Sequence, residues 1–477
     1  MSYSEDLARW TEQLRFEDLP DSVVRHTKFR MLDVVGLVLA GRGTAFGTSV
    51  CRAMSTLHPC GRSHILGSGV GTSVIGAAFA NGSLSQALEF DDTHNKSVVH
   101  MSSPAVAAAV AISETIPMSG RSLITSVALG NEISCRIGSI APQQFHKRGF
   151  HPTALFATLG VTYLSGKMYG LDVGQLRDAA GIAGSFASGL LECWVDGTQS
   201  KFLHPGSAAQ SGINAAMLAL CGTTGPEQVI EGRWGLINSH LQSSEVPRDY
   251  EQLVGGLGSR WESENASFKP FPVAHVIHPY IDALLRLREQ YNLRAADIVE
   301  IVCPIAEYQI GIVCEPLSEK YFPRSDSQGR ISLQFTLAEA MVAGRIDRHS
   351  YSNRALINPE IRALAQRIRY QVDPSFPGPE RFKGSVRVTL RDGRTVGSDE
   401  ENNRGSLLNP MTEEDIIAKF SDNVSEELSA LEGRRVIDFI LNLEDQDEAA
   451  TLVGLTVGGH TSSKSEMGSA IRVPPLP

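Results

Sequence analysis

Small and apolar residues recur at helical spacing through the first half of the chain, and this is its most regular pattern. From Thr72 onward, Ala and Gly line segments whose backbones can approach closely, as expected of helices that are apolar all round and therefore buried. The pattern predicts helices at residues 74–88, 104–116, 121–139, 152–169, 173–190 and 208–221. Two further helices are predicted at 5–14 and 21–41, so the region is expected to form one large all-α domain.

The pattern changes after Ser267–Pro272, a segment with two prolines that is expected to act as a hinge. Residues 298–304 are rich in β-branched side chains and predict a strand, and residues 383–390 alternate before the turn Asp392-Gly393, which is typical of a hairpin. Helical patterns at 279–291, 332–343 and 359–367 accompany them. We therefore predict a smaller α/β lid domain at residues 269–404, and a fold that is mainly α with an α+β lid.

The large domain is expected to span residues 1–268 and to be completed where the chain returns, at about 405–445. Helices are predicted there at 412–420 and 425–442, and a short helix at 226–231 and a short strand at 63–66 are also expected. Residues 458–477 lack a core pattern, which predicts a flexible tail.

Four predicted helices carry a histidine at or just before their first turn, namely His100, His151, His204 and His278. Pro directly follows three of them, as is common in a first helical turn, and Ser207 is predicted to cap the helix that begins one residue later. Lys201 lies just before His204. Free backbone N–H groups at a helix start favour bound anions, so we expect these starts to converge on one polyanionic small molecule. The alternative for any one histidine is a cap or a packed side chain.

Composition narrows the class of protein. The 477 residues are 42% hydrophobic and 20% charged, as in a globular protein of two or more domains. A net charge of −10 argues against nucleic acid as a partner, because nucleic acid needs clustered positive charge. The start MSYSEDLARW is unlike a signal peptide and the apolar run 34–40 is too short to span a bilayer, so a cytoplasmic protein without a membrane partner is expected. The cysteines form no CxxC pair, which argues against a zinc site or a disulfide framework.

Four motifs, in order along the chain, resemble the MmgE/PrpD family. They are ALEFDDTH at 87–94, GFHPT at 149–153, TQSKFLHPGSAAQSG at 198–212 and KPFPVAHVIHPYIDAL at 269–284. The resemblance implies a large all-α domain with a smaller α/β lid, usually in a homodimer. It also implies a small polycarboxylate substrate and no metal or organic cofactor. Members include 2-methylcitrate dehydratases, cis-aconitate decarboxylases and iminodisuccinate epimerases.

The decarboxylase branch of the family implies roles for particular residues. Its acidic residue, Thr and His of the first motif match Glu89, Thr93 and His100, although the family often has Asp where this chain has Glu89. The spacing to His100 is one residue longer than in animal decarboxylases, so His94 is a rival. The positions His151, Lys201 and His278 match better, and Tyr321 is a looser match in the lid. We expect His100 and His151 to carry protons, and Lys201, Thr93 and the helix start at His204 to hold carboxylates, with His278 completing the site on lid closure.

The reactions of the family share one chemical difficulty, because each builds negative charge on a carbon beside a carboxylate. They need cations or N–H donors where that charge develops, and an acid or base that titrates near neutral pH, which His supplies. The motif TxSKxLH favours a decarboxylase or an epimerase over a dehydratase. The prediction is a cofactor-independent lyase resembling cis-aconitate decarboxylase. A 2-methylcitrate dehydratase, an epimerase and a non-catalytic polycarboxylate-binding protein are the alternatives.

A metal site is the remaining alternative. Asp91 and Asp92 with His94 have metal-ligating side chains, but a turn whose carboxylates accept hydrogen bonds near a helix end is the favoured interpretation. The pair His275-x-x-His278 has no third partner at the spacing of a zinc protease, so packing is expected for His275.

Overall fold

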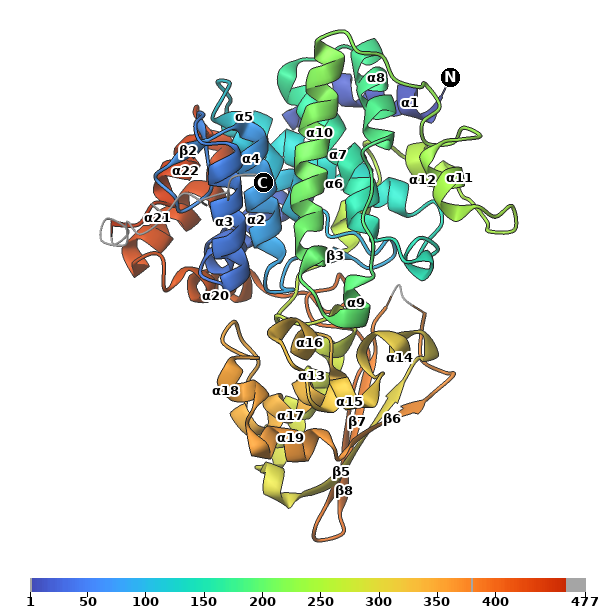
Figure 1. Cartoon of the computed structure of the whole chain (residues 1–477), viewed down its shortest axis with the longest axis vertical. Coiled ribbons are helices and arrows are strands. Elements are labelled where there is room, and N and C mark those ends of the chain that lie inside the picture. The colour runs from blue at the N-terminus through green and yellow to red at the C-terminus, as the bar shows by residue number, and fades with distance from the viewer. Residues whose placement is uncertain (1, 379–380, 460–477) are drawn as a thin grey trace, which may run out of the picture.

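The computed structural model describes residues 2–378 and 381–459, and it has a large helical lobe above a smaller lobe that contains the main sheet (Figure 1). Each lobe has its own apolar core. The core of the large lobe is built from side chains between Leu7 and Phe268 and between Ile416 and Val453, and the core of the small lobe from side chains between Phe271 and Leu390. The predicted fold class, mainly α with a smaller α/β part, is confirmed.

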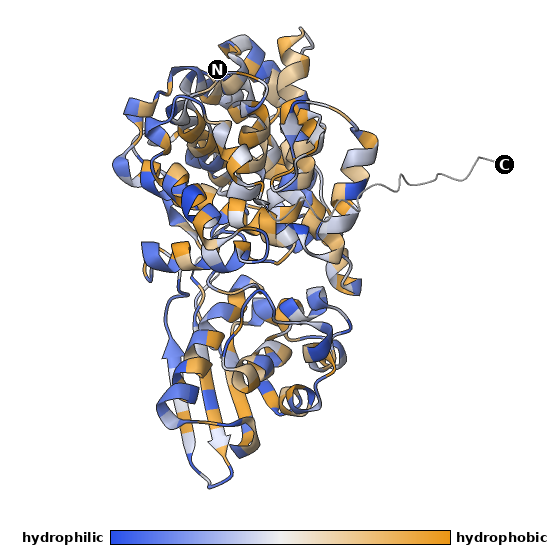
Figure 2. Cartoon of the chain, turned by 90° about the vertical axis from the view of Figure 1, so that its left-hand side faces the viewer, coloured by the Kyte–Doolittle hydropathy of each residue, from blue (hydrophilic) through white to orange (hydrophobic). Residues whose placement is uncertain are grey.

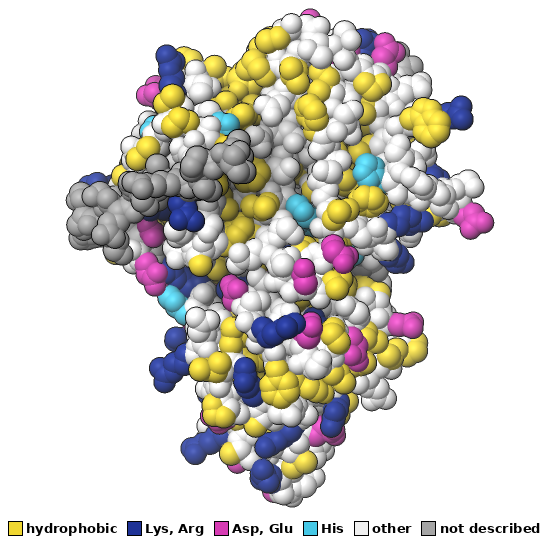
Figure 3. All heavy atoms as spheres, in the orientation of Figure 1, with side chains coloured by type: hydrophobic (Ala, Val, Ile, Leu, Met, Phe, Trp, Pro, Cys, Tyr) yellow, Lys and Arg dark blue, Asp and Glu magenta, His cyan; other side chains and the backbone are white. Residues whose placement is uncertain are grey.

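The large lobe is a bundle of helices around α7, which is almost entirely buried. Its longer helices are α1 (Tyr3–Gln13), α2 (Asp21–Arg42), α3 (Ala45–Leu57), α4 (Val74–Gln86), α5 (Ser102–Ser113), α6 (Gly120–Gly138), α7 (Pro152–Tyr169), α8 (Val173–Gly184), α10 (His204–Leu220), α20 (Glu413–Val424) and α21 (Ala430–Leu441). Helix α7 packs between α6 and α10, and α10 also packs against α4. Apolar residues recur along the helices of this bundle (Figure 2). Few charged side chains lie over the middle of this lobe on the face shown in Figure 3.

Two glycines bring α4 and α10 into backbone contact. A Cβ on Gly206 would lie 2.2 Å from the carbonyl oxygen of Phe79 and 2.3 Å from Ser83 Oγ. A Cβ on Gly82 would lie 2.8 Å from the backbone nitrogen of Gly206. Only glycine permits this approach, and it places the start of α10 against the helix that leads into residues 88–92.

The small lobe is a four-stranded mixed sheet with helices beside it. The strands are β5 (Ile298–Ile305), β6 (Ile368–Val372), β7 (Gly384–Leu390) and β8 (Thr395–Glu400), in the order β6-β5-β7-β8. Strand β6 runs parallel to β5, and β7 and β8 form the predicted hairpin, with Thr389 opposite Thr395. The helices are α13 (His278–Tyr291), α14 (Glu307–Val313), α15 (Leu317–Tyr321), α16 (Asp326–Arg330), α17 (Leu333–Ala343), α18 (Asn353–Leu356) and α19 (Pro359–Ala365). Strand β7 is largely buried, whereas β8 alternates and covers the edge.

Three local predictions were wrong. Residues 226–231 form turns and no helix, because a helix this short between Gly225 and Gly232 gains too few hydrogen bonds to offset its nucleation. Helix α8 ends at Gly184 rather than at 190, and the chain turns so that the Gly189 carbonyl accepts from the His151 N–H at 3.0 Å. Helix α10 begins at His204, so Ser207 lies inside it and does not cap it.

The predicted flexible tail lies outside the described residues from 460 onward. Among the residues that the structure describes, no single helix is long and apolar enough to cross a membrane. In the same part of the chain, α2 and α3 taken together, with a bend of 92° between them, meet the length and composition of a span.

The contact between α4 and α10 predicts the effect of a single methyl group. We expect Gly206→Ala to lower the free energy of unfolding by about 1–3 kcal/mol, because the new Cβ overlaps backbone and the helices must separate. Gly454→Ala is the control, since nothing lies within 4 Å of its Cβ and Ala favours a helix by up to ~1 kcal/mol. Urea unfolding measures both, and equal midpoints for the two variants would contradict the contact.

Candidate active site

A cavity of about 140 Å³ lies between the two lobes. From the large lobe and the connection to the lid its wall includes Glu89, Thr93, His100, His146, His151, Lys201 and Lys269. From the lid its wall includes His275, Val276, Tyr308, Ile312, Ile331 and Phe382. The structure therefore brings together Glu89, Thr93, His100, His151 and Lys201 from the expected set, whereas His204, His278 and Tyr321 are not part of the lining.

The chain between α4 and β3 (Thr93–His94) passes the cavity as residues Leu88–Asp92, which we call the 88–92 loop. Cationic side chains from five different segments hold this loop. Three of them donate to its backbone carbonyls: Arg330 to Leu88 (3.1 Å), Lys269 to Glu89 (2.9 Å) and Lys419 to Phe90 (2.8 Å). The other two contact its carboxylates, since Arg30 donates to Asp92 (2.7 Å) and Lys201 pairs with Glu89. All five cationic side chains are buried. Glu89 has a φ of +53°, a left-handed conformation of order 1 kcal/mol above the usual one, and these contacts hold it there.

The Glu89 carboxylate is the anion closest to the Lys201 ammonium. Lys269 Nζ lies 3.8 Å from its second oxygen. Burial alone would raise the pKa of Glu89, but Lys201, Lys269 and His100 together bring that pKa below its usual value, so Glu89 is ionised at neutral pH. An ammonium group has three donors, so Lys201 keeps donors beyond its contact with Glu89.

His100 is held by oxygens on one side of its ring. Its Nδ1 lies 2.9 Å from the Asp92 carbonyl and 3.3 Å from the Asp91 carboxylate, and the Thr93 hydroxyl is also 3.3 Å away. A carbonyl and a carboxylate only accept, so Nδ1 keeps its hydrogen and Nε2 is the nitrogen that exchanges protons. Burial would raise the pKa of Asp91, but His100, Lys269 and Lys201 lower it well below its usual value.

Asp91 and Asp92 also fix the start of α5. Asp91 accepts from Ser103 Oγ at 2.9 Å, and Asp92 accepts from the backbone N–H of Ser102 at 3.3 Å. Within residues 2–378 and 381–459, no three His, Cys, Asp or Glu side chains gather as a metal site would require. His94 points elsewhere, with its Nδ1 2.7 Å from Ser97 Oγ, and it lines a different pocket. Of the two rivals, His100 is therefore the one at the cavity.

His151 contacts both His100 and His204. The ring centres of His100 and His151 are 5.6 Å apart, and His151 Nδ1 lies 2.9 Å from His204 Nδ1. Burial, followed by Lys201, His204 and His100, lowers the pKa of His151 well below 6.5. Burial and then Lys201 lower the pKa of His204 to about 4. Both rings are therefore neutral at pH 7.

The lid contributes a different histidine and tyrosine from those expected. His278 lies behind His275, with ring centres 4.8 Å apart, and its Nε2 is 3.1 Å from the Val273 carbonyl oxygen. His275 forms part of the wall, and its Nε2 is 2.9 Å from Asn403 Nδ2. Tyr321 packs on the lid core with its hydroxyl 3.5 Å from Arg369, whereas Tyr308 lies in the wall.

Lys269 and His146 are wall residues that sequence reasoning missed. Lys269 opens the KPFP segment at the hinge, and a cation at the point where two domains meet is a signal that could have indicated it. His146 stacks edge-on against Trp194 with ring centres 4.9 Å apart. Burial, then Lys201 and His100, lower the pKa of His146 to about 4.

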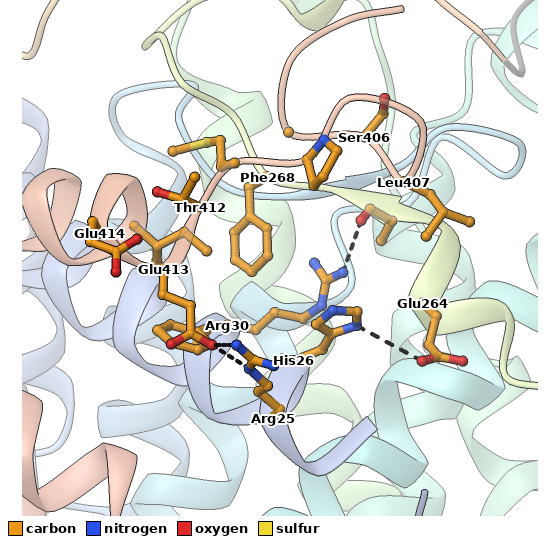
Figure 4. A pocket seen from close by; sticks show the side chains of 16 residues that line it. Arg25, His26, Arg30, Glu264, Phe268, Ser406, Leu407, Thr412, Glu413 and Glu414 are labelled. Carbon is orange, nitrogen blue, oxygen red and sulfur yellow. Dashed lines mark hydrogen bonds and ion pairs between the residues drawn. The ribbon is translucent and has the colours of Figure 1, made fainter. Parts of the chain in front are cut away.

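A second cavity of about 390 Å³ lies where the two connections between the lobes pass α2 (Figure 4). Its cations already have partners, since Arg25 pairs with Glu413 (Figure 4) and Arg30 donates to the Ala266 carbonyl. His26 lies 4.0 Å from Glu264. The smaller cavity between the lobes, with its neighbouring imidazoles and ammonium groups, is the better candidate for proton-transfer chemistry.

Comparison with known proteins shows which family the chain belongs to. The chain matches the MmgE/PrpD N-terminal domain over residues 5–249 and the MmgE/PrpD C-terminal domain over residues 271–445. The chain belongs to the MmgE/PrpD family. It is 28% identical to human cis-aconitate decarboxylase over 96% of this chain and 95% of that protein, and 25% identical to the Aspergillus terreus cis-aconitate decarboxylase over 94% and 95%. A 2-methylcitrate dehydratase of Cupriavidus necator is 22% identical over 59% of this chain and 58% of that protein. The chain is a lyase of this family, and its relatives act on small carboxylates.

The lowered pKa of His204 predicts part of the pH dependence of stability. In the unfolded chain His204 titrates near ~6.5, and in the folded protein near about 4, so the unfolded state binds more protons between these values. Its contribution is full above about 6.5 and is lost as the pH falls towards 4. We expect His204→Gln to flatten the fall in unfolding free energy between these pH values by about 1 kcal/mol per pH unit. Urea unfolding at several pH values measures this slope, and an unchanged slope would contradict the neutral state.

Proposed function

We propose that the protein decarboxylates cis-aconitate or a close tricarboxylate, with no metal or organic cofactor. The observation that carries this proposal is the gathering of Lys201, Lys269, His100 and His151 around one cavity between the lobes. Relatives named cis-aconitate decarboxylase at 25–28% identity over nearly the whole chain support the same reaction class. The shorter and weaker match to a 2-methylcitrate dehydratase makes dehydration the second candidate.

The substrate is expected to bind through its carboxylates. Lys201 and Lys269 supply two ammonium groups, and α7, which begins directly after His151, directs the positive end of its helix dipole towards the cavity. The Thr93 hydroxyl, which lies in the same wall, supplies one further hydrogen bond. In a buried site such fixed charges act more strongly than in water, because little solvent screens them.

Decarboxylation then moves two electron pairs. The carboxylate on the methylene carbon leaves as CO₂, and its bonding pair forms a new double bond to the central carbon. The former double bond moves its pair to the far carbon, which lies beside a carboxylate and must take up a proton. The cations stabilise that charge where it develops, and Nε2 of His100 or of His151 delivers the proton.

Bound substrate changes the charge around His151, and the lid keeps water out of the cavity. Burial and then Lys201 lower the pKa of His151, and a bound polyanion opposes the charge of Lys201, so this imidazole becomes easier to protonate when substrate is present. The lid covers the cavity with His275, Tyr308 and Phe382. Closure of this wall excludes water, which strengthens each charged contact and keeps solvent away from the carbanion.

Turnover in D₂O, followed by NMR, tests the proposed reaction. Purified protein is given cis-aconitate and, separately, 2-methylcitrate. We expect CO₂ release from cis-aconitate and a methylenesuccinate product with one deuterium on its saturated carbon. Turnover of 2-methylcitrate alone would instead establish a dehydratase, and binding of both compounds without turnover would contradict the reaction.

Replacement of Lys201 tests the role of its ammonium group. We expect Lys201→Met to lower kcat/KM by roughly 10²–10³-fold, because a charge donor at the developing anion is lost. Since this change also leaves Glu89 with one cation fewer, the double variant Lys201→Met/Glu89→Gln is included to restore the charge balance. Lys383→Met, in the lid and paired with Glu401, is the matched control. Near-normal turnover by a folded Lys201→Met protein would remove Lys201 from the mechanism.

A further inference from the structure

His151 and His204 share a single hydrogen. Their Nδ1 atoms are 2.9 Å apart and their ring centres 5.0 Å apart. A hydrogen bond needs one donor and one acceptor, so of two neutral rings one carries its hydrogen on Nδ1 and the other carries its hydrogen on Nε2. The position of the shared hydrogen therefore decides whether His151 Nε2 donates a proton or accepts one.

The pair leads from the cavity towards the outside of the large lobe. His151 is 1% exposed, lines the cavity, and its Nε2 is buried without a hydrogen-bond partner among the described residues. His204 is 9% exposed and lies behind it, outside the cavity wall. Gly189 closes over the pair, because its carbonyl accepts from the His151 N–H at 3.0 Å and a Cβ there would meet His204 Nδ1 at 3.4 Å.

The charge state of the pair creates a chemical requirement. Burial and Lys201 keep both imidazoles neutral at pH 7. A neutral imidazole that gives up its Nε2 hydrogen becomes an anion unless its other nitrogen gains a proton in the same step. For His151 that other nitrogen is Nδ1, and His204 is the group hydrogen-bonded to it.

We propose that His204 relays a proton between solvent and His151, so that His151 serves the reacting carbon while it remains uncharged. This proposal deepens the proposed function and rests on its cavity, but it does not depend on which family reaction takes place there. His204 is a positioning and relay residue, because it acts through His151 and does not line the cavity.

Every proton in the relay step is accounted for. As the carbanion takes up a proton, the Nε2–H bond of His151 breaks and a C–H bond forms. The Nδ1–H bond of His204 breaks and the Nδ1–H bond of His151 forms, while a hydronium ion or buffer acid protonates His204 Nε2. Each ring loses one proton and gains one, and one solvent proton is consumed. The opposite direction serves a reaction that removes a proton from carbon.

The kinetic test compares His204→Gln and His204→Ala with wild type, on whichever of cis-aconitate and 2-methylcitrate the wild-type protein turns over. A glutamine amide can hold His151 in place but cannot relay. We expect His204→Gln to lower kcat by ~10²-fold with KM within about threefold, and added imidazole to restore about tenfold in His204→Ala. His58→Gln, at the end of α3 and outside the cavity, is the control. If glutamine restores kcat to within about twofold of wild type, His204 only positions His151 and the relay is overturned.

A second measurement does not depend on turnover. Histidine labelled with ¹⁵N reports the protonation of each ring nitrogen by NMR, and His151→Asn and His204→Gln assign the two signals. We expect two neutral rings of opposite tautomer at pH 7. An imidazolium at either position, or hydrogen on Nε2 of both rings, would overturn the relay. Failure of the wild-type protein to turn over either substrate would instead contradict the proposed function, and the two failures are thus distinguishable.

Discussion

The structure depends on buried ion pairs and hydrogen bonds between the 88–92 loop and cationic side chains from five other segments of the chain. The 88–92 loop contains Glu89, Asp91 and Asp92, and it receives Arg30 from α2, Lys201 from the approach to α10, Lys269 from the hinge, Arg330 from the lid and Lys419 from α20. A buried charge without a partner costs several kcal/mol, so removal of any one of these groups leaves a penalty in the others. Because the cations come from both lobes, the same contacts fix the lid against the helical bundle.

The same charged groups also influence the protonation of the histidines at the site. Burial, followed by Lys201, which is one of the cations that hold the loop, lowers the pKa values of His146, His151 and His204. On the other side, His100 faces the Asp91 carboxylate and the Asp92 carbonyl, which fix its tautomer. The ring centres of His100 and His151 are thus 5.6 Å apart, but His100 contacts oxygen atoms whereas His151 contacts a second imidazole. Such asymmetry suits a site that must give and take protons at one carbon.

Much of the fold could be predicted from periodicity, because central helices of the large lobe such as α5 and α7 are buried on almost every side and the β7–β8 hairpin has an unambiguous turn. The errors arose where neighbours decide the outcome. Whether α10 begins at His204 or after Ser207 depends on the preceding turn (Ser200–Leu203), which runs directly into the helix. That shift in the helix start turns His204 away from the cavity and against His151. Likewise, His275 and His278 are three residues apart at the join of a short turn and α13, and the sequence does not show which ring faces the cavity. Lys269 was missed because its role depends on a contact with Glu89, far away in the chain.

A crystal structure with propane-1,2,3-tricarboxylate, the saturated analogue of cis-aconitate, would show directly whether this cavity binds the substrate. We expect its carboxylates to bind Lys201 and Lys269 in the cavity between the lobes, with its carbon chain beside His100 and His151. Binding instead in the larger cavity beside α2 would contradict this expectation, as would a tightly held metal ion among these side chains.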